Sequence, residues 1–167
     1  MIKAAFFDVD GTLMSHESRS VPQSTRDAID QLQAKGIACV VATGRQLEEM
    51  KKLPVRDIAF DSYITMNGQM CLNGKKEKLF DFPLEGEAKA LLLELFESHA
   101  LPVALMEEDI LYLNYVSQEV CEVQYPESYI TPLRRYLLWT QLSGMGSCEF
   151  LYRHTASPLR LHVLQWW

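Results

Sequence analysis

The 167-residue sequence lacks several features that would place it in a specialised class of protein. Its four cysteines form no CxxC pair, which argues against a zinc site or a disulfide scaffold and suits a reducing compartment. No apolar run approaches the roughly 20 residues of a membrane span, and two carboxylates near the N-terminus interrupt the stretch that a secretory signal would keep apolar. We therefore expect a cytoplasmic protein with no membrane partner.

Positive charge is also scarce. Lysine and arginine total 16 against 22 aspartate and glutamate residues, for a net charge of −6. An acidic surface repels phosphate backbones, so we expect no nucleic-acid partner, although a small phosphorylated substrate held beside a metal ion is not excluded. Hydrophobic residues make up 48% of the chain, which is enough for a core, and the length fits one domain or a small core carrying an insertion.

Three apolar segments in the first half of the chain predict buried strands. They span Ile2–Phe7, Ile37–Ala42 and Ile58–Met66, and the first two end in polar residues. Helical segments between them give the order strand, helix, strand, helix, strand. This order predicts a parallel Rossmann-like α/β sheet, and such sheets bind ligands at the carboxyl ends of their strands.

The intervening helices carry start and stop signals. Ser24 begins a stretch that resembles a capping box and is predicted to be the N-cap of the first helix, while Gly36 is a natural stop. A second, short helix is expected over Gln46–Leu53, because Pro54 ends it.

Beyond residue 66 the pattern changes. Asn67-Gly68 and Asn73-Gly74 predict tight hairpin turns, and apolar spacing predicts a helix from about Glu85 to His99. Val103–Met106 and Ile110–Val116 predict a hairpin that turns at Glu107-Glu108-Asp109, where three acids are expected to be solvated. We expect an α/β core over residues 1–82 and an α+β cap over residues 83–167. After about Tyr125 the sequence shows no sustained period.

Two carboxylates follow the first predicted strand. Asp8 and Asp10 are two residues apart and so leave the chain on the same side, where their mutual repulsion favours a hard cation such as Mg²⁺. One carboxylate could attack phosphorus while the other exchanges a proton with the leaving alcohol. Gly11 permits a tight turn whose N–H groups could cradle a phosphate, and Thr43 at the second strand end offers a hydroxyl to the same group.

Three segments carry a family resemblance. FFDVDGTL, which contains Asp8 and Asp10, looks like the first motif of the haloacid dehalogenase-like phosphatase superfamily, and VVATGR resembles its second motif. ITMNGQ, followed by a cap-like unit, is similar to the Cof-type subfamily with its large α/β cap. The resemblance implies a Mg²⁺-dependent phosphatase that hydrolyses a small phosphomonoester, such as a sugar phosphate, through an aspartyl-phosphate.

The resemblance also implies residue roles. Asp8 would be the nucleophile and a metal ligand, and Asp10 the general acid/base that also gives its backbone carbonyl to the metal. Phosphate or substrate would be bound by six residues: Gly11, Thr12, Thr43, Gly44, Arg45 and Asn67.

The sequence departs from the family after about residue 120. The lysine of the third motif and the acidic GDxxND-like loop of the fourth do not appear in the expected setting, and no aspartate follows Asp109. We therefore expect a fragment or frame-shifted version of a longer phosphatase. The coding DNA read in all frames, with the intact mass, tests this expectation.

Other interpretations remain open from the sequence. The chain could be a catalytically impaired remnant that at most binds Mg²⁺ or a phospholigand, or a receiver-like domain, although receivers place the accepting aspartate after a later strand. Arg45 could equally be a surface salt-bridge partner, Thr43 a helix cap and Asn67 a turn residue. The four histidines show no spacing for a metal or a triad. The substrate and the oligomeric state are not specified.

Overall fold

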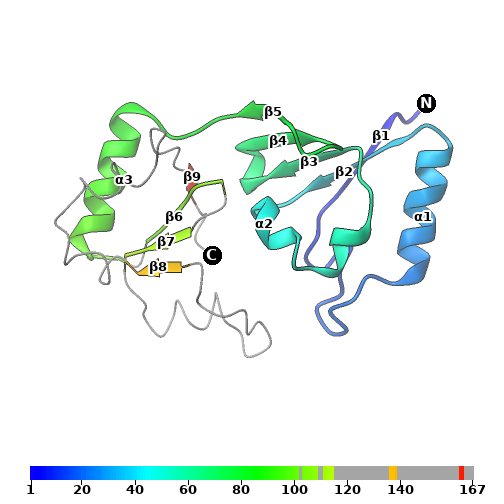
Figure 1. The fold of residues 1–167 in the computed structure, drawn as a ribbon, viewed down its shortest axis with the longest axis horizontal. Helices are drawn as coiled ribbons and strands as arrows, with labels where there is room; N and C mark the ends of the chain where they lie inside the picture. The colour runs from blue at the N-terminus through cyan, green and yellow to red at the C-terminus, as the bar shows by residue number, and fades with distance from the viewer. Residues whose placement is uncertain (102, 109–110, 115–135, 139–161, 164–167) are drawn as a thin grey trace. The chain divides into compact units, whose positions relative to one another are not determined.

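The computed structural model describes residues 1–101, 103–108, 111–114, 136–138 and 162–163 (Figure 1). The chain forms two compact units, Met1–Phe82 and Pro83–Trp167. Each unit is described by itself below. Every residue that the sequence predicts for the site lies in the first unit.

The first unit is built on a five-stranded sheet. Its strand order is β1-β2-β3-β4-β5; β1 to β3 run parallel, and β4 and β5 continue antiparallel (Figure 1). The predicted parallel α/β arrangement is therefore confirmed, and it brings the carboxyl ends of β1, β2 and β3 to one edge of the sheet. The strand bounds are Ala4–Phe7, Ala38–Ala42, Ser62–Thr65, Met70–Asn73 and Lys78–Asp81.

β1 is less buried than predicted. Val40 and Val41 in β2 are almost inaccessible, as expected of an apolar central strand, but the side chain of Phe6 in β1 is 63% exposed. Phe6 is exposed because β1 is the last strand of the sheet in the described part of the chain and has a neighbouring strand on one side only. The prediction of a fully buried first strand is therefore wrong.

The first helix, α1 (Gln23–Ala34), begins two residues earlier than the predicted capping box requires. Its N-cap is Pro22, whose carbonyl oxygen accepts hydrogen bonds from the backbone N–H groups of Thr25 and Arg26 at 3.1 and 3.3 Å. Ser24 lies inside the first turn and does not cap it, so the predicted N-cap is wrong. Proline fits this position because its ring fixes φ in the range that a helix entry needs. The predicted stop at Gly36 is confirmed by its left-handed φ of 73°.

Two elements of the first unit, the second helix and the third strand, are shorter than predicted. α2 covers only Leu47–Met50, closed by a capping box in which the Gln46 N–H donates to Glu49 Oε2 at 3.0 Å, and a 3₁₀ turn, η1 (Pro54–Asp57), follows. β3 then begins at Ser62, so the strand predicted from Ile58 starts four residues too early. The two predicted hairpin turns are confirmed between β3 and β4 and between β4 and β5.

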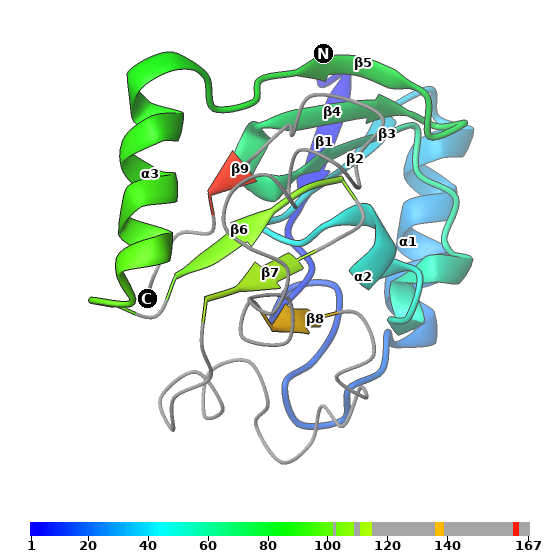
Figure 2. The same cartoon turned by 60° about the vertical axis from the view of Figure 1, so that its left-hand side comes forward.

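The second unit packs a helix against a four-stranded sheet. α3 (Gly86–Ser98) and the antiparallel pair β6 (Ala104–Met106) and β7 (Leu111–Leu113) confirm the predicted helix and hairpin (Figure 2). β8 (Tyr136–Leu138) pairs with β7, and β9 (His162–Val163) pairs with β6. The core of this unit consists of buried residues from α3, β6, β7 and the intervening loop: Phe96, Val103, Leu105 and Tyr112.

The predicted acidic turn of the second unit is only partly solvated. Glu107 is 9% exposed, and its carboxylate accepts a hydrogen bond from the Tyr112 hydroxyl at 2.8 Å, whereas Glu108 is exposed. A carboxylate that faces the core needs such a partner, so the expectation of a solvated Glu107 is wrong. Asp109 and most of the chain after Tyr125 lie outside the described residues.

Within the described part of the chain, no helix has both the length and the apolar character needed to cross a membrane.

Candidate active site

The loop after β1 holds the two predicted catalytic carboxylates. Val9 lies between them and is fully buried, whereas Asp8 is exposed and Asp10 is half-buried. The Met14 N–H donates to the Val9 carbonyl at 2.9 Å, and the Gly11 N–H donates to the Met14 carbonyl at 2.8 Å. These backbone bonds fold the loop back on itself and fix both aspartates at the carboxyl end of the strand.

Asp8 and Asp10 have different surroundings. Asp8 is exposed, and the described residues give its carboxylate no ion-pair partner. Asp10 has a side chain that is 31% exposed and bound by the Arg45 guanidinium, with Arg45 Nε at 2.7 Å from Oδ2 and Nη2 at 2.8 Å from Oδ1. The structure therefore leaves Asp8 free for a ligand or an electrophile and fixes Asp10 in one orientation.

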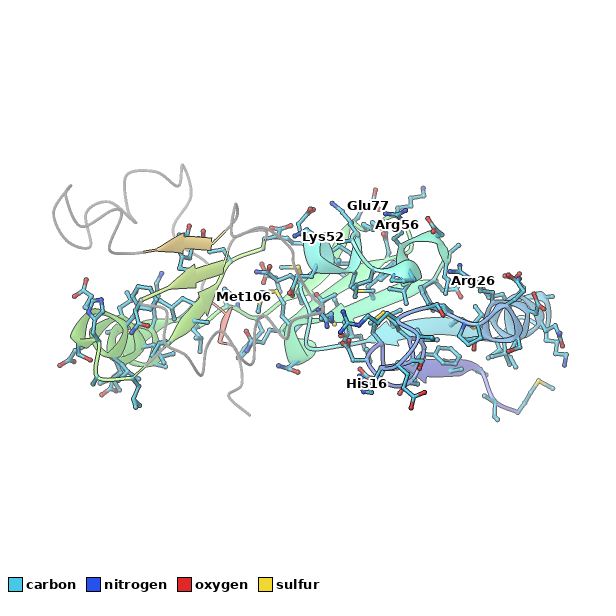
Figure 3. The ribbon with its side chains drawn as sticks, turned by 90° about the horizontal axis from the view of Figure 1, so that it is seen from below. His16, Arg26, Lys52, Arg56, Glu77 and Met106 are labelled. Carbon is cyan, nitrogen blue, oxygen red and sulfur yellow. The ribbon has the colours of Figure 1, made fainter. Side chains whose placement is uncertain are left out.

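Gly11 follows Asp10 and has a left-handed φ of 78°. A Cβ atom here would lie 2.5 Å from Nε2 of His16, so the imidazole occupies the space that glycine leaves open. His16 projects from the loop on the opposite side of the unit from Lys52 and Arg56 (Figure 3). The sequence did not single out His16, because only the backward turn of the loop brings it to Gly11.

The second strand end contributes the turn Thr43–Arg45. Thr43 is 7% exposed and its N–H donates to the Ile64 carbonyl at 2.9 Å, which ties the end of β2 to β3. The Thr43 hydroxyl oxygen accepts a hydrogen bond from the Arg45 N–H at 3.2 Å. The sequence left open whether Arg45 is a substrate ligand or a salt-bridge partner. In the structure Arg45 forms a salt bridge with Asp10.

The third strand end packs on the second. η2 (Met66–Gly68) contains three consecutive residues with positive φ, of 54°, 55° and 91°. The Asn67 N–H donates to the Thr43 carbonyl at 3.2 Å, and Asn67 Oδ1 lies where a side chain on Gly44 would begin, 2.9 Å from a Cβ placed there. Gly44 is therefore required for the close approach of these two turns.

Three lysines of the first unit have partners away from the two aspartates. Lys51 pairs with Glu48, Lys78 lies 3.5 Å from Asp81, and Lys76 Nζ lies 5.9 Å from the centre of the Tyr63 ring. Among the residues that the structure describes, no lysine is paired with Asp8 or Asp10. Among the described residues, Arg45 is therefore the cation that pairs with Asp10, and none pairs with Asp8.

The first strand end offers hard oxygen atoms for a divalent cation. The carboxylate of Asp8 has no cationic partner among the residues that the structure describes, and the resemblance assigns the backbone carbonyl of Asp10 as a second oxygen ligand. Such oxygen atoms suit Mg²⁺, which commonly binds through one or two carboxylates and retains several waters. The described residues contain no group of three or more His, Cys, Asp or Glu side chains placed to hold a metal. The residues present therefore fit Mg²⁺ in a partly hydrated form.

Cys39 lies in β2, and its buried thiol is not activated as a nucleophile. Burial raises the pKa of the Cys39 thiol, and the Asp61 carboxylate raises it further. The same carboxylate accepts a hydrogen bond from the Cys39 N–H at 2.7 Å. The thiol therefore stays protonated, and a cysteine nucleophile in this part of the unit has no support.

Comparison with known proteins identifies the class that this fold and site define. Residues 5–150 match the family of haloacid dehalogenase-like hydrolases, and the chain belongs to that family. The motif residues Asp8, Asp10 and Thr43 all lie within the matched stretch.

Individual relatives carry phosphatase names. The chain is 32% identical over 107 residues to "Putative phosphatase YkrA" of Bacillus subtilis (strain 168), a match that covers 64% of this chain and 40% of YkrA. Among solved structures, it resembles the phosphatase BT1666 of Bacteroides thetaiotaomicron, with 27% identity and a TM-score of 0.68 over 79% of this chain and 48% of that one. It also resembles the subclass IIB sugar phosphatase BT4131, with 29% identity and a TM-score of 0.63 over 85% of this chain and 55% of BT4131. The chain thus spans about half the length of the relatives it matches, or less.

Proposed function

We propose that the chain hydrolyses small phosphomonoesters and that Asp8 is the nucleophile. The observation that carries the proposal is the contrast between the two carboxylates at the end of β1. Asp8 is exposed and has no ion-pair partner among the described residues, whereas Asp10 is oriented by Arg45. Membership of the haloacid dehalogenase-like hydrolases and the phosphatase names of the relatives support the reaction class.

The reaction takes place in two steps on Asp8. A carboxylate oxygen of Asp8 attacks phosphorus in line, the bond between phosphorus and the ester oxygen breaks, and Asp10 gives its proton to the leaving oxygen. Water then attacks the aspartyl-phosphate, Asp10 takes a proton from that water, and inorganic phosphate leaves with Asp8 restored. Most of the rate enhancement in such transfers comes from positioning and charge.

The phosphoryl oxygens need donors and positive charge. In the proposal, the backbone N–H groups of Gly11 and Thr12 and the hydroxyl and N–H of the Thr43–Gly44 turn surround the phosphoryl group. Asn67 faces the substrate beyond that turn. Mg²⁺, held by Asp8 and the Asp10 carbonyl, supplies charge that offsets the repulsion between the carboxylates and the phosphate. We propose a sugar phosphate or a similar ester as the substrate class, after the sugar phosphatase that the chain resembles.

Phosphatase assays of the full chain test the proposal. We expect release of phosphate from p-nitrophenyl phosphate and from hexose phosphates in Mg²⁺, loss of the activity in EDTA, and recovery when Mg²⁺ is returned. Asp8→Asn should remove turnover, and it should also remove the acid-stable phosphate that labels the chain after quenching. Asp57→Asn is the matched control, since Asp57 is exposed on η1 and pairs with its neighbour Arg56.

Two results contradict the proposal. Turnover that survives Asp8→Asn excludes the aspartyl-phosphate mechanism. A wild-type chain that is folded by circular dichroism yet releases no phosphate from any of these esters, and takes up no phosphate label, excludes the phosphatase activity itself.

A further inference from the structure

The two hydrogen bonds from Arg45 fix the orientation of the Asp10 carboxylate as well as its distance from the guanidinium. Arg45 donates through Nε to one carboxylate oxygen of Asp10 and through Nη2 to the other, at 2.7 and 2.8 Å. Two parallel hydrogen bonds define the plane of the carboxylate, because rotation about the Cβ–Cγ bond would break both. A single lysine ammonium could hold the charge nearby but could not hold the plane.

Arg45 is itself held at several points. Its N–H donates to Thr43 Oγ1 at 3.2 Å, and its carbonyl accepts the Met66 N–H at 3.1 Å. On the far side of the guanidinium, Nη1 lies 3.8 Å from Glu49 Oε1. The guanidinium is therefore placed between two carboxylates, with its own backbone fixed between β2 and β3.

The turn that supports Arg45 adopts an unfavourable backbone conformation. Met66 and Asn67 both have left-handed φ values, of 54° and 55°, although neither is glycine. A left-handed backbone is unfavourable for a residue that carries a Cβ atom, and Met66 is buried as well. Strain of this kind persists where the surrounding structure fixes it and concentrates near functional sites. Here the turn binds both the carbonyl of Thr43 and the carbonyl of Arg45.

We propose that Arg45 is the positioning residue that aims the Asp10 carboxyl group at the leaving oxygen of the ester. The inference rests on the proposed function, since it assigns to Arg45 the orientation of the acid used in that reaction. Arg45 touches no reacting atom in this role. Its contribution appears only when the leaving oxygen needs a proton, because only then does the direction of the Asp10 carboxyl group affect the rate.

Leaving-group dependence separates this role from the alternatives. p-Nitrophenolate leaves without a proton, whereas the alkoxide of an alkyl phosphate such as glycerol 2-phosphate needs one. The experiment measures kcat and KM of the full chain in Mg²⁺ on both esters, for wild type, Arg45→Met, Arg45→Lys and Asp10→Asn. Arg56→Met is the matched control, since Arg56 is exposed and pairs only with its neighbour Asp57 among the described residues.

We expect Arg45→Met to lower kcat on the alkyl ester on the order of 10–100-fold more than on p-nitrophenyl phosphate, within the range that general acid catalysis contributes. KM should stay within about twofold of wild type. Arg45→Lys should recover little of the loss, and Arg45→Met should add little to Asp10→Asn because both changes remove one function. Arg56→Met should leave both esters unaffected.

Each other outcome overturns a distinct statement. An equal loss on both esters, with a raised KM, shows that Arg45 binds the substrate phosphate and contradicts the positioning role alone. Unchanged kinetics in Arg45→Met contradict that role as well. A wild-type chain that hydrolyses neither ester contradicts the proposed function, and the role of Arg45 is then rejected with it.

Discussion

The imidazole of His16 fills the space where a Cβ atom would lie if Gly11 were any other residue. A Cβ atom at Gly11 would be 2.5 Å from His16 Nε2, well inside the contact distance of the two atoms. This contact joins two parts of the loop between β1 and α1, which carries Asp8 and Asp10. It also gives Gly11 two separable reasons to be glycine, namely its φ of 78° and the space that His16 fills.

The first prediction separates these two reasons. Gly11→Ala should destabilise the chain by about 1–2 kcal/mol for the left-handed backbone and by about 1–3 kcal/mol more for the overlap with His16. Gly36→Ala is the matched control, because Gly36 also has a left-handed φ, of 73°, but no atom lies within 4 Å of its Cβ position. Urea unfolding should therefore show the larger loss at Gly11. In a His16→Ala background the two alanine variants should lose similar amounts, and a persistent difference would contradict the contact.

The second prediction concerns the contact between Gly44 and Asn67. Gly44→Ala places Cβ 2.9 Å from Asn67 Oδ1, so the amide must move and the free energy of unfolding should fall by about 1–2 kcal/mol. Asn67→Gly removes the amide and keeps a residue that accepts the left-handed backbone. A double-mutant cycle by urea unfolding should show that Gly44→Ala costs much less in the Asn67→Gly background. Additive losses would show that the two turns do not touch through this side chain.

The third prediction concerns Asn114 in the second unit. Its side chain is fully buried, accepts a hydrogen bond from the Val103 N–H at 2.8 Å, and donates to the carbonyls of Phe96 and Leu101 at 3.2 and 2.8 Å. Asn114→Ala leaves these backbone groups without their partner, at about 1–3 kcal/mol for each buried group. We expect a total loss of at least about 2 kcal/mol in urea unfolding. Ser98→Ala changes the exposed last residue of α3 and should lose less than about 1 kcal/mol, and equal losses would contradict the role of Asn114.

The fourth prediction uses the two cysteines that the structure describes. Burial and the Asp61 carboxylate raise the pKa of Cys39, whereas Cys71 is partly exposed. Since the thiolate is the reactive form, iodoacetamide at pH 8 should label Cys71 at least tenfold faster than Cys39, as followed by peptide mass spectrometry. Unfolding in urea should make the two rates similar. Faster labelling of Cys39 in the native chain would contradict the burial of β2.

The raised pKa of Cys39 also has a consequence for stability. Between the ordinary value of 9.0 and the higher native value, the folded chain binds more protons than the unfolded chain. The contribution of this thiol to stability is therefore fully present below pH 9 and is lost as the pH rises through the native pKa. Cys39→Ala should show a shallower loss of stability over that interval than wild type.

Local patterns predicted the strands better than the ends of the helices. The continuous apolar run before Thr43 predicted a buried strand, and β2 lies there. At the start of α1, the sequence predicted Ser24 as the N-cap, but Pro22 is the N-cap because its carbonyl accepts the first hydrogen bonds of the helix. The spacing of residue types did not locate this helix end. The exposure of Phe6 depends on strand order, which no local pattern encodes.

The residues of the candidate site were also predicted only in part. The chemistry-bearing types Asp8, Asp10 and Thr43 were predicted because each directly follows an apolar run. The pairing of Asp10 with Arg45 joins residues 35 positions apart, and it depends on the reach of a long side chain across two strand ends. His16 was missed for the same reason, since only the folded loop returns it to Gly11. The left-handed turn at Met66 was also missed, because methionine carries no sequence signal for positive φ.

The three strand ends are joined in series, and this has a consequence for how the carboxylates tolerate change. The turn after β3 holds the carbonyl of Arg45 through the Met66 N–H, and Arg45 holds Asp10. A residue that relaxes the backbone at Met66 would therefore disturb the proposed acid, Asp10, without contacting it. If the proposed function holds, variation at Met66 should change which alcohols depart easily, while the proposed nucleophile, Asp8, stays intact.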